Sequence, residues 1–492
     1  MTKTKETKEH THKHASEERT PRGGLKVAYC ILLVAQAVTN GLLLTALAKL
    51  NLLQSWQFFA VLIVLIGIFC FNLYKLVISK CAGLIVKIVC AIIAIALIVA
   101  GSFGYKYARQ TINFVEQVTG AHYETQTYQV RVLKNSSYKD VSQLSRQHIG
   151  LLNTNPNLSN TQKALKNAVD FKAKEYSEIG SMIAAIYDFD VAAIVINQSY
   201  LDFLEEADNK FVDESTSIYE FEVRMDAPDN RKPVNVTTEP FILYISGSDS
   251  RGAITETARS DVNILAVVNP KDFKILLVSI PRDYYVQLHG TTGTKDKLTH
   301  AGIYGIDMSK TTIEDLLNIK INYTIKVGFT TLTKVVDAVD GIDIYSDTAF
   351  KRGNCTFVQG DQHLNSECAL LYARERYSYS SGDRHRGQNQ QQIITALIAK
   401  ISDPHYLVRY SKILESAQDS FESSLSFDEI TSFARYQLSE LRTWKVESIS
   451  LDGTGAMMPT YSMGAQLLYV MQPNANTITN AQKKINDYLT TK

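Results

Sequence analysis

Acidic residues are absent from one long stretch of this chain, because no Asp or Glu occurs between Glu18 and Glu116. The 492 residues are otherwise balanced in charge, with 51 Lys and Arg against 50 Asp and Glu. Domains that bind nucleic acid usually carry a strong excess of positive charge. The balance therefore argues against direct nucleic-acid binding. A hydrophobic fraction of 45% excludes a chain that is disordered throughout.

Three apolar segments fill the stretch without acidic residues: 27–48, 56–74 and 82–104. Each is close to the roughly 20 residues with which an α-helix crosses a hydrocarbon core of about 30 Å. A buried helical hairpin of a soluble protein would need a polar face, which these segments lack. The first segment also lacks the cleavage site of a signal peptide and is too long for one. We therefore predict three transmembrane helices over 27–104.

The distribution of Lys and Arg predicts how these helices are oriented, because positive charge accumulates on the cytoplasmic side of a membrane. The tail 1–26 is rich in Lys and Arg, whereas the loop 49–55 has a single Lys. We expect a cytoplasmic tail over 1–26 and, after three crossings, an extracellular location for everything that follows. This is the topology of a multi-pass protein of the cell membrane.

The external part is expected to contain two domains. Residues 105–235 begin with an amphipathic connector and then combine a strand-like run at 125–134 with helical patterns at 141–152 and 161–171. This predicts a smaller α+β accessory domain, and no catalytic constellation is visible in it. A polar, proline-containing stretch around 226–239 is typical of a linker.

Residues 240–492 have a different pattern, in which short apolar runs rich in β-branched residues alternate with helical spacing. Such alternation predicts an α/β domain with layers of helices around a central mixed β-sheet. Only two cysteines lie in the external part, Cys355 and Cys368. In an oxidising compartment this pair is expected to form a disulfide; two buried thiols are the alternative.

Arginines gather near the predicted ends of these strands and helices. Ligands of layered α/β proteins bind at strand ends, and a guanidinium matches phosphate oxygens in a bidentate way. A pyrophosphate is therefore a candidate ligand. Asp249 and Asp261 lie among the arginines and could bind Mg²⁺ together with phosphate oxygens. A network of surface Arg–carboxylate pairs explains the spacing equally well. The arginines are Arg251, Arg259, Arg282, Arg374, Arg376 and Arg386.

The same segments resemble, in order, the motifs of the LytR-CpsA-Psr family of membrane-anchored cell-envelope proteins over roughly 240–400. The three predicted spans and the extra external domain are similar to family members from streptococcal capsule loci. The motifs are GSDSR (247–251), ARSDVNIL (258–265), LLVSIPRDYYV (276–286), DKLTHA (296–301), GDQHLNSECALLYARER (360–376) and GDRHRGQNQQQII (382–394).

The resemblance implies a transferase that attaches a glycopolymer, carried on polyprenyl pyrophosphate, to peptidoglycan through a phosphodiester. For capsule-locus members the polymer is capsular polysaccharide, and capsule biosynthesis proteins are further partners. The resemblance also implies Mg²⁺, or Mn²⁺, bound by Asp249 and Asp261.

The family motifs also imply roles for individual residues. Arg282, Arg374 and Asp383 are the expected catalytic residues, and Asp383 or Asp261 would accept a proton. One departure is Asn389, which stands where many members have an arginine, so one positive charge is missing here. The expected pyrophosphate-binding residues are Arg259, Arg282, Arg374, Arg376, Arg386 and Gln390.

Two other functions stay open at this point. The first is a membrane-bound regulator or attenuator of capsule expression, although the short tail shows no helix-turn-helix pattern for binding DNA. The second is a protein that binds polyprenyl pyrophosphate and hydrolyses it without transfer to an acceptor. The motifs alone do not distinguish water from a sugar hydroxyl as the attacking group.

Overall fold

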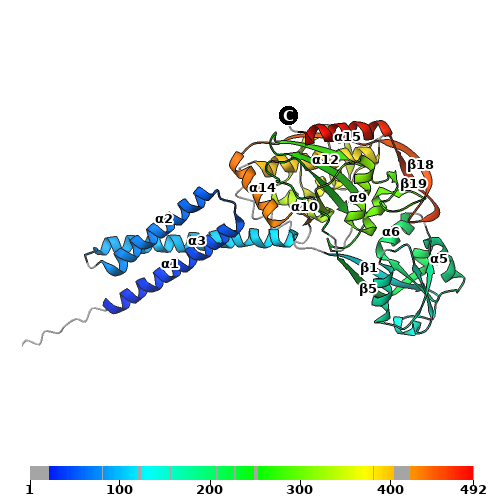
Figure 1. Ribbon diagram of the computed structural model, residues 1–492, viewed down its shortest axis with the longest axis horizontal. Coiled ribbons are helices and arrows are strands. Elements are labelled where there is room, and N and C mark those ends of the chain that lie inside the picture. Colours follow the sequence, from blue (N-terminus) through cyan, green and yellow to red (C-terminus); the bar gives the residue numbers. More distant parts are fainter. Residues whose placement is uncertain are drawn as a thin grey trace, which may run out of the picture. The chain divides into compact units, whose positions relative to one another are not determined.

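The computed structural model describes residues 22–79, 81–119, 123–155, 157–206, 209–226, 229–248, 253–379, 382–403 and 421–490. The chain forms two compact units, Met1–Arg109 and Gln110–Lys492. Figure 1 shows the elements of both units in sequence colours.

The first unit consists of long apolar helices. They are α1 (Arg22–Leu50), α2 (Ser55–Leu73), the π-helical turn η1 (Tyr74–Ile78) and α3, which begins at Leu84. Among the described residues, three segments are long and apolar enough to cross a membrane: Gly24–Leu50, Ser55–Ile78 and Leu84–Thr119. Helix α3 does not end near residue 104 but continues to Thr119, so the predicted amphipathic connector is part of the same helix.

Within the second unit, an accessory part (residues 123–226) forms a sheet of five strands in the order β3-β2-β4-β1-β5. Strands β2, β3 and β4 are parallel, and β1 is antiparallel to β4 and β5. Its elements are β1 (Tyr123–Leu133), η2 (Val141–Leu144), β2 (His148–Leu152), α4 (Leu158–Lys166), β3 (Lys172–Tyr176), α5 (Ile179–Tyr187), β4 (Ala193–Asn197), α6 (Gln198–Glu206), α7 (Phe211–Glu214) and β5 (Ser215–Asp226).

The helix predicted over 141–152 is wrong in its second half, where the chain forms strand β2. A short, continuous apolar run has the same appearance in a buried strand and a buried helix, so periodicity does not separate them. Gly150 fits this central position because an added Cβ would approach Ile194 and Met182 to 3.1 Å.

The C-terminal part (residues 229–490) is built on a sheet of six strands in the order β16-β11-β6-β7-β8-β17. The sheet is mixed: β6 is parallel to β11 and β8 to β17, whereas β7 is antiparallel to β6 and β8. The strands are β6 (Phe241–Ser248), β7 (Val262–Asn269), β8 (Lys274–Ser279), β11 (Tyr323–Gly328), β16 (Phe421–Ser423) and β17 (Lys445–Ser450).

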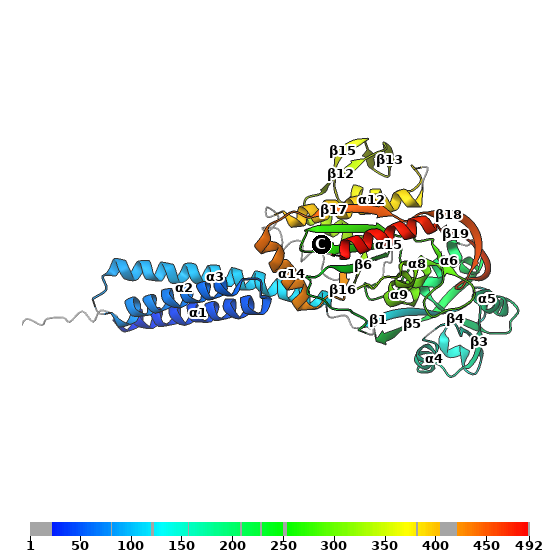
Figure 2. The same cartoon turned by 45° about the horizontal axis from the view of Figure 1, so that its top comes forward.

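Helices cover both faces of this sheet (Figure 2). Alternate residues of β7 point to opposite faces, so that Leu265 packs with α9 (Ile306–Leu317) and α15 (Ala475–Leu489). Ile264 packs on the other face. That second face is covered by α10 (Phe329–Ala338), α12 (Asp383–Ser402) and α14 (Phe427–Glu440), through side chains that include Phe329, Ile394 and Phe433.

Shorter elements complete the C-terminal part. The sequence patterns did not indicate the β18–β19 hairpin or α15. The remaining elements are β9 (Tyr285–Val286), β10 (Asp296–Lys297), α8 (Leu298–Ala301), η3 (Gly302–Tyr304), β12 (Ile342–Ser346), β13 (Phe350–Arg352), β14 (Cys355–Phe357), β15 (Gly360–Leu364), α11 (Ser366–Ala373), β18 (Gly453–Thr460) and β19 (Gly464–Pro473).

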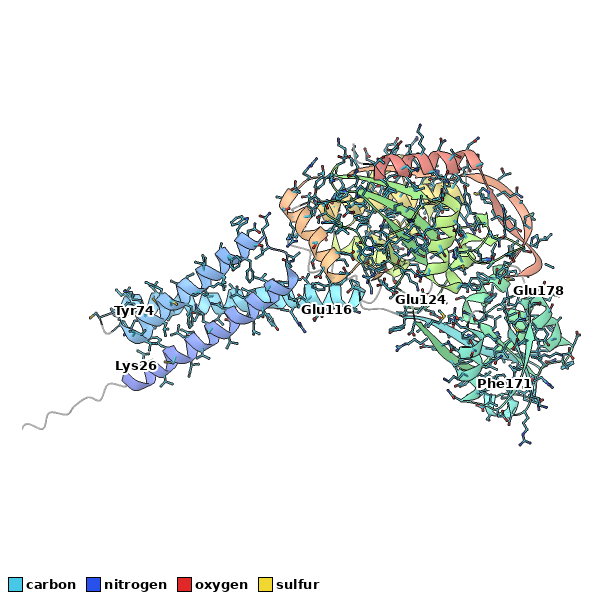
Figure 3. The ribbon with its side chains drawn as sticks, viewed as in Figure 1. Lys26, Tyr74, Glu116, Glu124, Phe171 and Glu178 are labelled. Carbon is cyan, nitrogen blue, oxygen red and sulfur yellow. A yellow bond between two sulfur atoms is a disulfide. The ribbon has the colours of Figure 1, made fainter. Side chains whose placement is uncertain are left out.

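The accessory and C-terminal parts share one hydrophobic core. Ile303, Met463 and Leu468 from the C-terminal part are buried together with Met182 and Phe203 of the accessory part. Figure 3 labels Glu178, whose carboxylate lies near Gly464 at the turn of the β18–β19 hairpin. The two parts therefore pack against each other within one compact unit.

Candidate active site

The candidate site lies at the edge of the six-stranded sheet where β6, β8 and β11 end. These three strands run in the same direction, and the antiparallel strand β7 begins at that edge. Arg259 and Asp261 precede β7, and Arg282 follows β8. The strand order thus brings together charged residues that are up to 23 positions apart in the sequence. This agrees with the expectation that ligand-binding residues gather at strand ends.

An open cleft of about 510 Å³ lies at this edge. Six arginines and three acidic residues line it, so its surface is strongly positive and suited to a ligand with several negative charges. The lining residues are Asp202, Glu205, Arg259, Asp261, Arg282, Phe329, Arg352, Arg374, Arg376, Tyr377 and Arg386.

Arg282 and Asp261 form the innermost ion pair of the cleft. Their side chains are only 12% and 10% exposed, and Nη1 of Arg282 donates to Oδ1 of Asp261 over 2.6 Å. Burial alone would raise the pKa of Asp261, but the nearby charges of Arg282 and Arg259 outweigh it and lower that pKa below its ordinary value. Asp261 is therefore a carboxylate, and it holds the Arg282 guanidinium in place before any ligand binds.

A second buried pair lies behind Arg282. The Lys297 ammonium is 2.8 Å from Oδ1 of Asp283, and Nε of Arg282 is 3.6 Å from the other Asp283 oxygen. Burial would raise the pKa of Asp283, but Lys297 and Arg282 outweigh it and lower that pKa. The backbone N–H of Thr299 also donates to the Arg282 carbonyl over 2.8 Å. The DKLTHA segment therefore positions the arginine without entering the cleft itself.

His300 has a structural place. It is fully buried, its Nδ1 atom is 2.7 Å from Asp296 Oδ1, and the hydroxyl of Ser462 lies 2.8 Å from the same nitrogen. Its ring packs at a tilt against Phe203 of the accessory part, with 4.0 Å between centroids. His300 does not line the cleft.

Arg374 and Arg376 follow α11 and line the cleft. The Arg374 guanidinium lies 5.3 Å from the centre of the Phe329 ring, a cation–π contact that orients it. Nη2 of Arg376 donates to the Tyr377 hydroxyl over 2.7 Å. This hydrogen bond and the charge of Arg376 lower the pKa of Tyr377.

Arg352 is a cleft residue that the sequence argument missed. It lies in the β13–β14 hairpin, and its guanidinium is paired with the buried carboxylate of Glu375. The second Glu375 oxygen accepts from the backbone N–H groups of Tyr377 and Ser378 over 2.6 and 2.9 Å. Burial would raise the pKa of Glu375, but its hydrogen bonds, first that from Arg352, lower it. Arg352 does not lie next to an end of a strand in the six-stranded sheet, so its position in the sequence did not indicate the cleft. The hairpin reaches the cleft through tertiary packing.

A disulfide links the β13–β14 hairpin to α11. Cys355 in β14 is bonded to Cys368 in α11, with 5.7 Å between their Cα atoms. Helix α11 ends immediately before Arg374. The bond thus joins the hairpin that carries Arg352 to the helix that directly precedes Arg374.

Helix α12 contributes the last group of predicted residues. Arg386 lines the cleft, and it shares a small adjoining pocket with Gln390. Gln390 is nearly buried and donates to the Ala373 carbonyl over 3.3 Å. Asn389 is fully buried and donates to the Tyr372 carbonyl over 3.1 Å, so it faces α11. Asp383 is the first residue of the helix; its side chain is outside the described structure.

Asp249 and Arg251 also fall outside the described residues. No group of three or more His, Cys, Asp or Glu side chains suited to a metal occurs in the parts of the chain that are described. Mg²⁺ is usually held by only one or two carboxylates together with phosphate oxygens of the ligand. The ionised Asp261 carboxylate at the cleft fits that donor set.

Comparison with known proteins identifies relatives of this chain. The LytR_cpsA_psr family model matches residues 208–484. A second model, described as DNA polymerase processivity factor, matches 85–196 and starts inside the apolar helix α3. The polyisoprenyl-teichoic acid–peptidoglycan teichoic acid transferase TagU of Enterococcus faecalis is 32% identical over 256 residues, which cover 52% of this chain and 81% of that protein.

Two further proteins are similar to this chain. TagU of Bacillus cereus is 38% identical over 194 residues, which cover 39% of this chain and 63% of that protein. The crystal structure of B. subtilis TagV is 30% identical, covers 51% of this chain and 98% of that chain, and has a TM-score of 0.44. Because the family model spans more than half of the 492 residues, this chain is a member of the LytR_cpsA_psr family.

Proposed function

We propose that this protein transfers a glycopolymer from a polyprenyl pyrophosphate carrier to peptidoglycan and forms a phosphodiester. The observation that supports this most is that six arginines and Asp261 line the same open cleft. Guanidinium groups bind phosphate oxygens bidentately, and phosphoryl transfer depends mainly on positioning and charge neutralisation. The names of the relatives support the reaction class, since they are transferases that act between polyisoprenyl-linked polymer and peptidoglycan.

In the proposed reaction, the arginines bind the pyrophosphate oxygens of the donor. A hydroxyl of the peptidoglycan sugar attacks the phosphorus next to the polymer, and a new P–O bond forms. The bond from that phosphorus to the bridging oxygen breaks, and polyprenyl phosphate leaves with the electron pair. The hydroxyl proton goes to a carboxylate. We assign this role to Asp383, because the lowered pKa of Asp261 makes that group a weak base.

Mg²⁺ or Mn²⁺ is proposed as the metal, with Asp261 and Asp249 as its protein ligands. A bound ion would neutralise charge on the phosphate oxygens. The orientation of the apolar helices, with the N-terminus in the cytoplasm and the cleft outside the cell, is likewise proposed from the Lys and Arg bias. The polymer is proposed to be capsular polysaccharide, on the resemblance to capsule-locus members alone.

A reconstitution tests the reaction. The full chain in detergent is mixed with lipid-linked polymer, a soluble peptidoglycan oligomer and Mg²⁺, and the products are separated by mass. A covalent conjugate of polymer and peptidoglycan supports transfer. Free phosphorylated polymer without conjugate contradicts it and supports hydrolysis. An Arg282→Ala variant should give neither product and is the control for a contaminating enzyme.

A further inference from the structure

We infer that the accessory part forms the acceptor side of the cleft, where Asp202 and Glu205 of α6 bind hydroxyl groups of the acceptor glycan. This inference rests on the proposed transfer reaction and adds to it the residues that recognise the acceptor. Both acids lie before residue 208, where the match to the family model begins.

Helix α6 is fixed against the C-terminal part. The Ser199 hydroxyl donates to the Thr257 carbonyl over 2.9 Å, two residues before Arg259. The hydroxyls of Tyr200 and Tyr304 are 3.0 Å apart. Phe203 is buried and packs against the His300 ring. These contacts come from one face of the helix and leave its opposite face to the cleft.

The face toward the cleft carries the two acids. Asp202 and Glu205 are three residues apart, so they lie on the same side of the helix. Both line the cleft that contains the six arginines. Asp202 Oδ2 lies 3.6 Å from Nη2 of Arg259, yet the Asp202 side chain remains 55% exposed. Its carboxylate is thus anchored at one edge and accessible to a ligand.

The carboxylates of Asp202 and Glu205 have a different role from that of the arginines. They repel a pyrophosphate, so they do not bind the donor head group. Ionised Asp and Glu act only as hydrogen-bond acceptors, and their preferred partners are N–H and O–H donors. The acceptor glycan supplies many hydroxyl groups and must lie beside the donor phosphate. Two carboxylates beside the arginines of the same cleft therefore suit a reaction in which a neutral sugar hydroxyl attacks a phosphate.

The experiment uses the full chain in detergent and three variants: Asp202→Asn, Glu205→Gln and the double variant. Asp213→Asn is the matched control, because Asp213 is an exposed acid on the neighbouring helix α7 and does not line the cleft. Calorimetry measures binding of a soluble peptidoglycan glycan oligomer and, separately, of a short-chain polyprenyl pyrophosphate. Transfer is then measured at saturating donor with varied acceptor.

The double variant should bind the glycan about tenfold or more weakly, the effect expected for losing hydrogen bonds to charged groups. Its affinity for the pyrophosphate should stay within about twofold, and Asp213→Asn should change neither. Unchanged glycan binding in the double variant would overturn the inference. So would a loss of pyrophosphate affinity alone, which would show that Asp202 only positions Arg259. If the wild type binds glycan through these acids but forms no conjugate, the proposed transfer fails and the glycan site stands.

Discussion

The Nη1 atom of Arg282 lies 2.6 Å from Oδ1 of Asp261, and both side chains are almost completely buried at the edge of the sheet. The arginine is therefore oriented before a donor arrives. Such preorganisation is the main way in which a protein stabilises charge that develops during phosphoryl transfer.

Replacement of Arg282 tests this arrangement. Arg282→Ala should lower the transfer rate by about 100-fold or more, a loss typical for one preorganised charged donor. Arg282→Lys should lower it nearly as far, because an ammonium keeps the charge but loses the guanidinium fork. Formation of wall-linked polymer measures the effect, with membrane abundance of each variant as the control. A normal yield in the Lys variant would show that bidentate binding is unimportant.

Arg352 should behave as a donor-binding residue even though it lies outside the family motifs quoted above. Arg352→Ala removes one of the cleft charges and leaves the buried Glu375 carboxylate without this partner. We expect the KM for the lipid-linked donor to rise about tenfold. Lys351→Ala is the matched control, since Lys351 is the preceding residue of β13 and is exposed. Equal effects of both substitutions would mean that only the hairpin, and not the guanidinium, matters.

The disulfide between Cys355 and Cys368 should stabilise the hairpin that carries Arg352. Digestion without reduction should release the two cysteines in one linked peptide, which mass spectrometry detects. Loss of a bond that closes a loop of this size costs about 3 kcal/mol in the free energy of unfolding. A Cys355→Ser, Cys368→Ser variant should therefore be less stable and bind donor more weakly. If donor affinity is unchanged in that variant, the disulfide does not support Arg352.

Glu422 should make stability depend on pH. Its burial raises its pKa from 4.5 to about 7, with Lys326 opposing the shift and Glu124, labelled in Figure 3, adding to it. The unfolded chain loses this proton near pH 4.5, whereas the folded chain keeps it until about pH 7. The free energy of unfolding should therefore fall by about 3 kcal/mol as the pH rises through that window, and then stay level.

The pH dependence is measured by chemical denaturation in detergent. Fluorescence of Trp444 reports on the C-terminal part in a Trp56→Phe background, since these are the two tryptophans of the chain. Glu422→Gln should abolish the slope and raise stability at pH 8. Glu440→Gln, at an exposed position on α14, should leave the slope as it is. A slope that persists in Glu422→Gln would assign the effect to another group.

Asn389 offers a test of one departure from the family pattern. Asn389→Arg restores the arginine that many members have, but it places a charge where the wild-type side chain is fully buried against α11. We expect a loss of about 3 kcal/mol or more in the free energy of unfolding and no gain in transfer. Increased transfer without loss of stability would show that the arginine reaches the cleft and that the charge is missing in the wild type.

Much of the site could be predicted from the sequence because its residues flank buried strands. The apolar runs of β6, β7, β8 and β11 are short and continuous, so their ends, and the position of Arg259, Asp261 and Arg282, follow from local pattern. The apolar helices could also be predicted from local pattern. These features depend on neighbours in the sequence.

The features that were missed depend on packing between distant segments. Arg352 reaches the cleft because a hairpin folds back against residues 374–377, and nothing local to residue 352 encodes that contact. In the sequence, Asp202 and Glu205 are two acids on an ordinary amphipathic helix. Only the packing of α6 beside Arg259 brings them to the cleft. Strand β2 was mistaken for a helix because its pairing partners, β3 and β4, lie further along the chain and leave no mark on the local pattern.

The hydrophobic core shared by the accessory and C-terminal parts has a consequence for genetics. Removal of residues 123–226 would expose Ile303, Met463 and Leu468 to water, and contiguous apolar patches of this kind promote aggregation. The phenotype of a strain with that deletion would therefore reflect mainly the loss of the protein through proteolysis. Single substitutions on the surface of α6 are the informative alleles, because they leave the core intact.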